Sequence, residues 1–157
     1  MKGDKSTLKQ VTLTSMIKAP PEFIRKAFPR TWYHPRGKLL TWYPRGVLNE
    51  AFADQVIAFI EMEESIQEAP FDRYADLSGL THIRLGIDHI IHTARRRRHV
   101  QQPVKTALFA DNPVIFGVAH SYESLMYHAM IHVRAFNERT TAAEWLEVPL
   151  TTLKCPS

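Results

Sequence analysis

The sequence has little cysteine and no long apolar segment. Its one thiol, Cys155, has no second cysteine to pair with in 157 residues, so a disulfide within the chain is excluded. The position of Cys155 near the end of the sequence favours an unfixed tail thiol over a nucleophile held in a pocket. No apolar run approaches the ~20 residues that cross a bilayer, and residues 1–10 lack the apolar core of a secretion signal. We therefore expect a cytoplasmic protein without a membrane span.

Common motifs of catalysis and cofactor binding are also missing. The sequence contains no Walker A loop, no Gly-x-Gly-x-x-Gly, no Gly-x-Ser-x-Gly, no His-Glu-x-x-His and no Cys-x-x-Cys. His89 and His92 stand three residues apart in a helical pattern, but a zinc site needs a third ligand, and no motif supplies one. We expect a protein that is not an enzyme and that uses neither a cofactor nor a metal.

Positive charge is in mild excess and is concentrated in one run. The formal net charge is +4, and the run RRRRH places four arginines at the end of a predicted helix: Arg95, Arg96, Arg97 and Arg98. Consecutive helical residues are rotated by ~100°, so the four side chains cannot share one face. A solvated helix end is the leading interpretation, and the alternative is a site for an anion such as phosphate, nucleic acid or an acidic protein. Nucleic acid is not an expected partner, because the sequence has no known recognition module.

Strands and helices alternate from residue 38 onward. Apolar residues at helical spacing and caps at Asn49 and Asn112 predict helices, and short apolar runs predict strands. The predicted strands are 38–43, 73–79, 104–110 and 131–136, and the predicted helices are 50–67, 88–99, 113–129 and 141–146. Strict alternation indicates an α/β fold with a mostly parallel sheet flanked by helices.

Two helical details carry further expectations. Asp54, Glu61 and Glu64 fall on the polar side of the first helix, which we expect to be a solvated face. Thr141 and Glu144 have the spacing of a capping box at the start of the last helix.

The first part of the chain is less regular. Residues 11–17 predict an edge strand, and residues 20–28 predict a short helix with proline in its first turn. The stretch TWYHPRGKLLTWYPRG predicts a hairpin with strands at 31–33 and 38–43. The alternative is an exposed aromatic and basic patch of Trp32, Tyr33, Arg36 and Arg45. We assign an N-terminal extension to 1–37, one domain to 38–147 and a tail to 148–157.

Three fragments carry a family resemblance: DLSGL (76–80), FGVAHSYE (116–123) and VRAFNERTTAAEWL (133–146). In this order and spacing they resemble the STAS superfamily of anti-sigma-factor-antagonist-like domains, in particular its SpoIIAA-like branch of bacterial proteins, which is related to the CRAL-TRIO lipid-binding fold. The resemblance implies a superhelix of βα units.

The resemblance also bears on phosphorylation. In anti-sigma-factor antagonists, a serine or threonine at a helix start accepts phosphate, where the free amides and the helix dipole stabilise the added charge. The matching stretch here is HIRLGID, which has Arg84, Leu85 and Gly86 at that place and no hydroxyl. We therefore expect no phosphorylation switch of this kind.

The loop at 76–86 supplies the first candidate binding residues. Asp76 lies near the end of the strand predicted at 73–79, and we expect its carboxylate to accept backbone N–H groups in the turn. Loops at strand ends of α/β proteins often bind ligands. The candidates for contact with a ligand or partner are Asp76, Ser78, Thr81 and Arg84.

The helix at 113–129 supplies the second group. Large apolar and small residues recur at helical spacing: Phe116, Gly117, Ala119, Tyr122, Met126 and Met130. Packing against the sheet is the leading interpretation, with a close backbone approach that compensates for glycine within a helix. The alternative is a pocket or groove lined by Phe116, Tyr122 and the methionines. Glu123 is a further candidate contact.

Two functions are consistent with these observations. The first is a non-enzymatic interaction or regulatory module that binds a protein partner or a second copy of the chain as a homodimer. The alternative is a carrier or sensor of a small apolar or lipid-like molecule.

Overall fold

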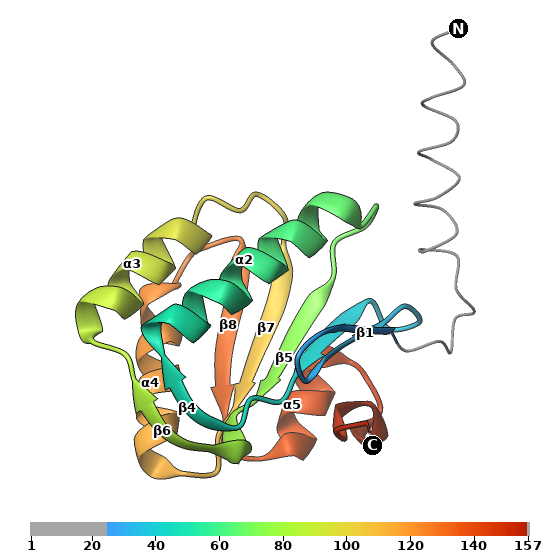
Figure 1. Ribbon diagram of the computed structural model, residues 1–157. Coiled ribbons are helices and arrows are strands. Elements are labelled where there is room, and N and C mark those ends of the chain that lie inside the picture. The colour runs from blue at the N-terminus through green and yellow to red at the C-terminus, as the bar shows by residue number, and fades with distance from the viewer. Residues whose placement is uncertain (1–24, 157) are drawn as a thin grey trace, which may run out of the picture.

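The computed structural model describes residues 25–156 (Figure 1). The edge strand expected at 11–17 lies outside these residues. Among the described residues, no helix is both long enough and apolar enough to cross a membrane.

A six-stranded sheet forms the centre of the fold. Its strands are β1 (Arg25–Phe28), β2 (Thr31–His34), β3 (Leu39–Trp42), β5 (Asp72–Asp76), β7 (Val104–Phe109) and β8 (Ile131–Phe136), and their order across the sheet follows the chain. The first three strands are antiparallel, and β3, β5, β7 and β8 are parallel. Arg73 on β5 pairs with Thr106 on β7, as expected for neighbouring strands. The structure confirms an α/β fold with a mostly parallel sheet flanked by helices.

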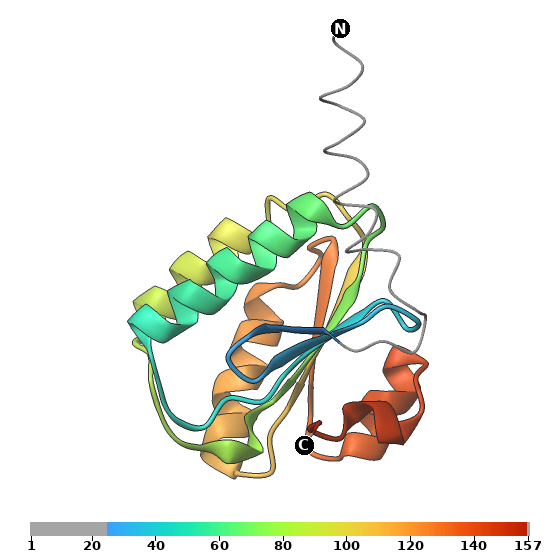
Figure 2. The ribbon, with the colours of Figure 1, turned by 45° about the vertical axis from the view of Figure 1, so that its right-hand side comes forward.

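Helices cover both faces of this sheet. The helices α2 (Glu50–Ile66), α3 (Ile87–Arg97) and α4 (Pro113–Leu125) lie on one face, and α5 (Arg139–Leu146) lies on the other (Figure 2). The caps expected from the sequence are confirmed: the Asn49 side chain accepts a hydrogen bond from Phe52 N, and the Asn112 side chain accepts one from Val114 N. The caps satisfy amides that have no partner within the helix.

A second, two-stranded parallel sheet was not expected from the sequence. It consists of β4 (Gly46–Asn49) and β6 (Leu80–Arg84). A short 3-10 helix, η1 (Leu77–Gly79), separates β5 from β6. Gly79 is required there, because a Cβ atom at this position would lie 2.7 Å from the Pro44 carbonyl oxygen. The small sheet is separate from the main one, and its two strands lead the chain from β3 into α2 and from β5 into α3.

The first described residues differ from expectation. Residues 25–28 form β1 and pair with β2, so the helix expected at 20–28 is wrong for this part. The predicted hairpin of β2 and β3 is confirmed, but the alternative aromatic and basic patch is not formed. Tyr33 is buried against Phe71. Trp32 packs edge-on against Tyr43, with 5.7 Å between the two ring centroids.

The last described residues belong to the domain. The 3-10 helix η2 (Leu150–Leu153) packs on α5, Leu153 is buried in the core, and the Tyr43 hydroxyl donates to Leu153 O at 2.9 Å. The tail expected from residue 148 is therefore wrong for this segment. The capping box is also wrong: Glu138 is the N-cap of α5, and Thr141 lies within the first turn and donates to Glu138 O.

Candidate functional site: an apolar cavity between the sheet and three helices

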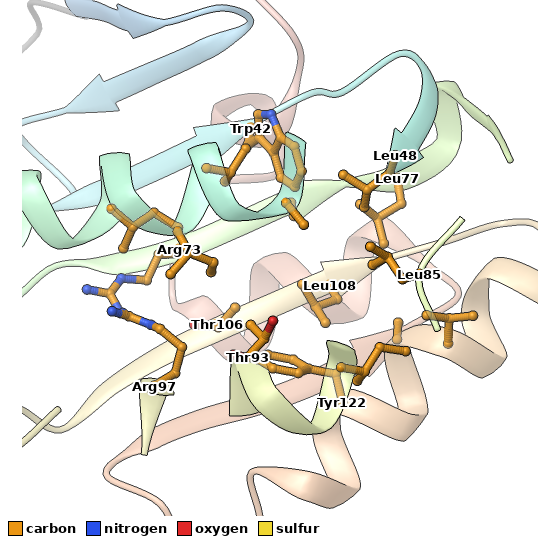
Figure 3. A pocket seen from close by; sticks show the side chains of 18 of the residues that line it. Trp42, Leu48, Arg73, Leu77, Leu85, Thr93, Arg97, Thr106, Leu108 and Tyr122 are labelled. Carbon is orange, nitrogen blue, oxygen red and sulfur yellow. The ribbon is translucent and has the colours of Figure 1, made fainter. Parts of the chain in front are cut away.

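A cavity of 170 Å³ lies between the sheet and α2, α3 and α4 (Figure 3). Short apolar runs on β3 and β7 form its floor, and the apolar stripes of the three helices form its roof. The apolar lining includes Leu40, Trp42, Leu48, Val56, Ile60, Leu77, Ile90, Leu108, Ala119 and Tyr122. Aliphatic and aromatic walls of this kind favour an apolar occupant over water.

One end of the cavity is polar. Arg73 on β5 and Arg97 on α3 place their guanidinium groups side by side there, at the opposite end from Leu48, Leu77 and Leu85 (Figure 3). Glu64 on α2 accepts from both: its Oε2 lies 2.6 Å from Arg73 Nη2 and 2.7 Å from Arg97 Nη2. The side chains of Arg73 and Arg97 are only 6% and 3% exposed. The result is a buried ion cluster that Glu61 joins from its edge, with Oε2 at 3.5 Å from Arg97 Nη1.

The Glu64 carboxyl is held ionised. Burial alone would raise its pKa, but the hydrogen bonds from Arg97 and the charge of Arg73 outweigh burial and lower the pKa below its usual value. Both carboxylate oxygens of Glu64 already accept hydrogen bonds. Glu64 is thus arranged to neutralise two arginines.

Two buried hydrogen-bond donors of the lining have no acceptor among residues 25–156. Trp42 Nε1 and Arg73 Nε are buried without a partner. Tyr122 also lines the cavity, and burial raises the pKa of Tyr122 to about 12, so its hydroxyl stays protonated at neutral pH. Unsatisfied buried donors are costly, so a bound molecule that carries an acceptor would relieve them.

The loop candidates do not form one surface. Asp76 is buried, and its Oδ1 accepts from Ser78 N at 3.1 Å and from the Ser78 hydroxyl at 2.5 Å, which confirms its predicted role in the turn. Thr81 and Arg84 lie farther along on β6, where Thr81 donates to Gly46 O and Arg84 is exposed. Arg139, which sequence reasoning missed, donates from Nε to Asp76 Oδ2 at 2.9 Å.

The candidates on α4 also separate. Tyr122 lines the cavity, whereas Phe116 lines an open groove beside Ile87 and His120. Glu123 accepts from the Ala135 amide at 2.7 Å. Met126 is buried in the core and Met130 is exposed, so the expected pocket of Phe116, Tyr122 and methionines is wrong in its composition. The close approach expected at Gly117 is wrong too, since no atom lies within 4 Å of a Cβ atom built there.

The arginine run is not a single exposed cluster. Arg97 is buried and pairs with Glu64, so a solvated helix end is wrong for this residue, and the same pair shows that Glu64 is not on a solvated face. Arg96 bonds to Glu61, and Arg98 donates to the carbonyl oxygens of Leu125 and Tyr127. Arg95 is exposed without a partner among the described residues.

His89 pairs with a carboxylate of the neighbouring helix. Its Nε2 lies 3.0 Å from Asp54 Oδ1, and its ring lies 6.2 Å from that of His92. Over the described part of the chain, no group of three His, Cys, Asp or Glu side chains is arranged to hold a metal ion.

The comparisons with known proteins give one structural similarity. No protein-family model matches the chain, and no curated protein matches it. The chain is similar to the solved structure of an uncharacterized protein of the DUF3478 family from Shewanella loihica PV-4, described as having a SpoIIAA-like fold. The TM-score is 0.47 and the sequence identity is 12%, over 79% of this chain and 90% of that chain. That description names the fold that the three sequence fragments resemble.

Proposed function

We propose that the protein binds one small, largely apolar molecule in the cavity between the sheet and α2, α3 and α4. The observation that supports this proposal is a cavity of 170 Å³ with an apolar lining and a polar end. An engineered protein cavity of about 150 Å³ is large enough to take up benzene. The occupant would therefore have roughly the size of one aromatic ring or a short hydrocarbon chain.

The polar end favours an occupant with an acceptor at one end. Arg73 Nε at this end is buried without a partner among the described residues, and Trp42 Nε1 is a second such donor elsewhere in the lining. We propose a binding role without catalysis, because Glu64, the carboxylate at this end, already accepts hydrogen bonds from two arginines. Binding of a protein partner through the loop at 76–86 stays a prediction. The loop residues expected to make that contact do not share one surface.

Filling the cavity tests the proposal. Ala119 lies on α4, is 4% exposed and lines the cavity, so Ala119→Leu places three more carbon atoms in the binding space. At a toluene concentration ten times its Kd, the wild type should gain about 1.4 kcal/mol, or roughly 3–5 °C in Tm. Ala119→Leu should show no toluene-dependent rise, as measured by a thermal melt.

A matched control separates the effect of filling the cavity from the effect of introducing a leucine. Ala58→Leu makes the same change on the exposed face of α2 and should keep the full toluene response. Ala53→Leu, which also enters the cavity, serves as a second filled variant in case Ala119→Leu folds poorly. An unchanged toluene response in a folded Ala119→Leu or Ala53→Leu protein would contradict the proposal, as would no response in the wild type.

A further inference from the structure

A second pocket, separate from the cavity, lies where β3 and β5 end. Its volume is 670 Å³, and it shares no lining residue with the cavity. The walls are the turn between β1 and β2, the segment after β3, the η1 turn, the start of α5 and the end of η2. Five segments that are distant in the sequence thus meet around one space.

The lining of this pocket is strongly cationic. It contains four positive side chains, Arg30, Arg45, Arg139 and Lys154, and one carboxylate, Asp76. Arg45 and Lys154 are exposed, and their side chains have no hydrogen-bond or ion-pair partner among the described residues. Like charges gathered in one pocket repel each other, so an anion that enters would be held by several cations at once.

Asp76 offsets one of the four positive charges, and its acceptor positions are already occupied. Oδ2 accepts from the Tyr74 hydroxyl and from Arg139 Nε, both at 2.9 Å, and Oδ1 accepts twice from Ser78. Arg139 is also held by its Nη2, which donates to the Ser78 hydroxyl at 3.1 Å, and by its position over the Phe109 ring. Asp76 therefore orients Arg139 at the wall of the pocket.

Arg30 is held in place from the opposite wall. Its backbone has φ 56°, a left-handed conformation that costs a non-glycine residue free energy and that often marks a functional site. Tyr43 N donates to Arg30 O at 2.9 Å, and Arg30 Nε donates to Tyr43 O at 2.6 Å. Its Nη2 lies 3.4 Å from Cys155 Sγ, so neither contact gives the guanidinium group a carboxylate.

We propose that this pocket binds a phosphate monoester of a small molecule. Guanidinium groups match phosphate oxygens with paired hydrogen bonds, and lysine adds a mobile point charge. A dianion suits a lining with a net charge of +3, and a volume of 670 Å³ leaves room for the group that the phosphate esterifies. The proposal rests on residues outside the apolar cavity and is independent of the function proposed above.

An NMR titration of the full chain tests this assignment. Inorganic phosphate and glycerol 3-phosphate are added separately at low ionic strength, and acetate is added as a monoanion. Both phosphates should give saturable shifts at the amides around Arg30, Arg45, Ser78 and Lys154, and glycerol 3-phosphate should bind at least as tightly as phosphate. The double variant Arg45→Ala/Lys154→Ala should weaken both by about tenfold or more, because it removes two cations of the lining whose side chains make no hydrogen bond or ion pair within the described residues.

The control is the double variant Arg84→Ala/Arg95→Ala. It removes the same charge from two exposed arginines that also lack partners among residues 25–156, and it should leave phosphate binding within about twofold. If both double variants weakened phosphate binding equally, net charge alone would explain the effect, and the proposed site would be overturned. Absence of saturation, acetate binding as tight as phosphate, or saturation by inorganic phosphate alone would each overturn the assignment to a phosphate monoester.

Discussion

Replacing Glu64 with glutamine should lower the free energy of unfolding by about 3 kcal/mol. The side chains of Arg73 and Arg97 are 6% and 3% exposed, and Glu64 accepts hydrogen bonds from both. Glutamine keeps the shape of the side chain but removes the charge, so two buried guanidinium groups lose their shared counterion. Urea denaturation at pH 7 measures the loss, and the control Glu68→Gln, at an exposed position, should change the free energy by less than about 0.5 kcal/mol.

The same substitution has a predictable pH dependence. The pKa of Glu64 is lowered from 4.5 in the folded protein, because its hydrogen bonds and charge pairs with Arg97 and Arg73 outweigh its burial. A lowered carboxyl pKa contributes stability that is complete above the unfolded value and is lost as the pH falls through the folded value. The difference between wild type and Glu64→Gln should therefore shrink below about pH 4.5. A difference that stays constant down to pH 3, or no difference at pH 7, would contradict the ion cluster.

Replacing Asp76 with alanine should cost a similar amount, about 3 kcal/mol. Asp76 accepts four hydrogen bonds, from the Tyr74 hydroxyl, twice from Ser78, and from Arg139. Alanine leaves the Tyr74 hydroxyl, on a residue that is 1% exposed, without its acceptor and releases the charged Arg139 side chain.

The control for Asp76 lies just beyond the neighbouring strand. Asp111 follows β7 by two residues, is exposed and has no partner among the described residues, so Asp111→Ala should change the free energy of unfolding by less than about 0.5 kcal/mol. Chemical denaturation of both variants at pH 7 gives the comparison. Equal free energies for the two variants would show that the buried network around Asp76 does not stabilise the fold.

The parallel part of the sheet could be predicted because its elements are marked locally. The strand predicted at 131–136 has the same bounds as β8, and the caps at Asn49 and Asn112 begin α2 and α4 as expected. Caps and apolar periodicity are properties of neighbouring residues, so they can be read without knowledge of the fold.

The small sheet could not be predicted in the same way. The strands β4 and β6 have four and five residues, and they pair with each other across more than thirty positions of the chain. Glycines mark turns beside both strands, at Gly46, Gly79 and Gly86, but four or five residues are too few to show a periodic pattern. Their pairing depends on β3 and β5 already lying side by side.

The cavity could not be predicted from the sequence either, because it also depends on how distant elements pack. Arg73 stands directly before the apolar Tyr74 and Ala75 of β5, and this was the available signal that a charge is buried there. Glu64 stands on a face of α2 that is polar in its pattern, yet it is only 13% exposed because α2 packs over β5. The packing of α2 and α3 on the sheet determines that Glu64 meets Arg73 and that Arg97 joins this pair.

The most direct measurement of ligand binding in the cavity is a crystal structure of the full chain soaked with toluene. Density for one toluene molecule should lie between Leu48, Leu108 and Ala119 and should be missing from the Ala119→Leu crystal. Side chains that fill this space in the unsoaked crystal, with no toluene density after soaking, would contradict the account.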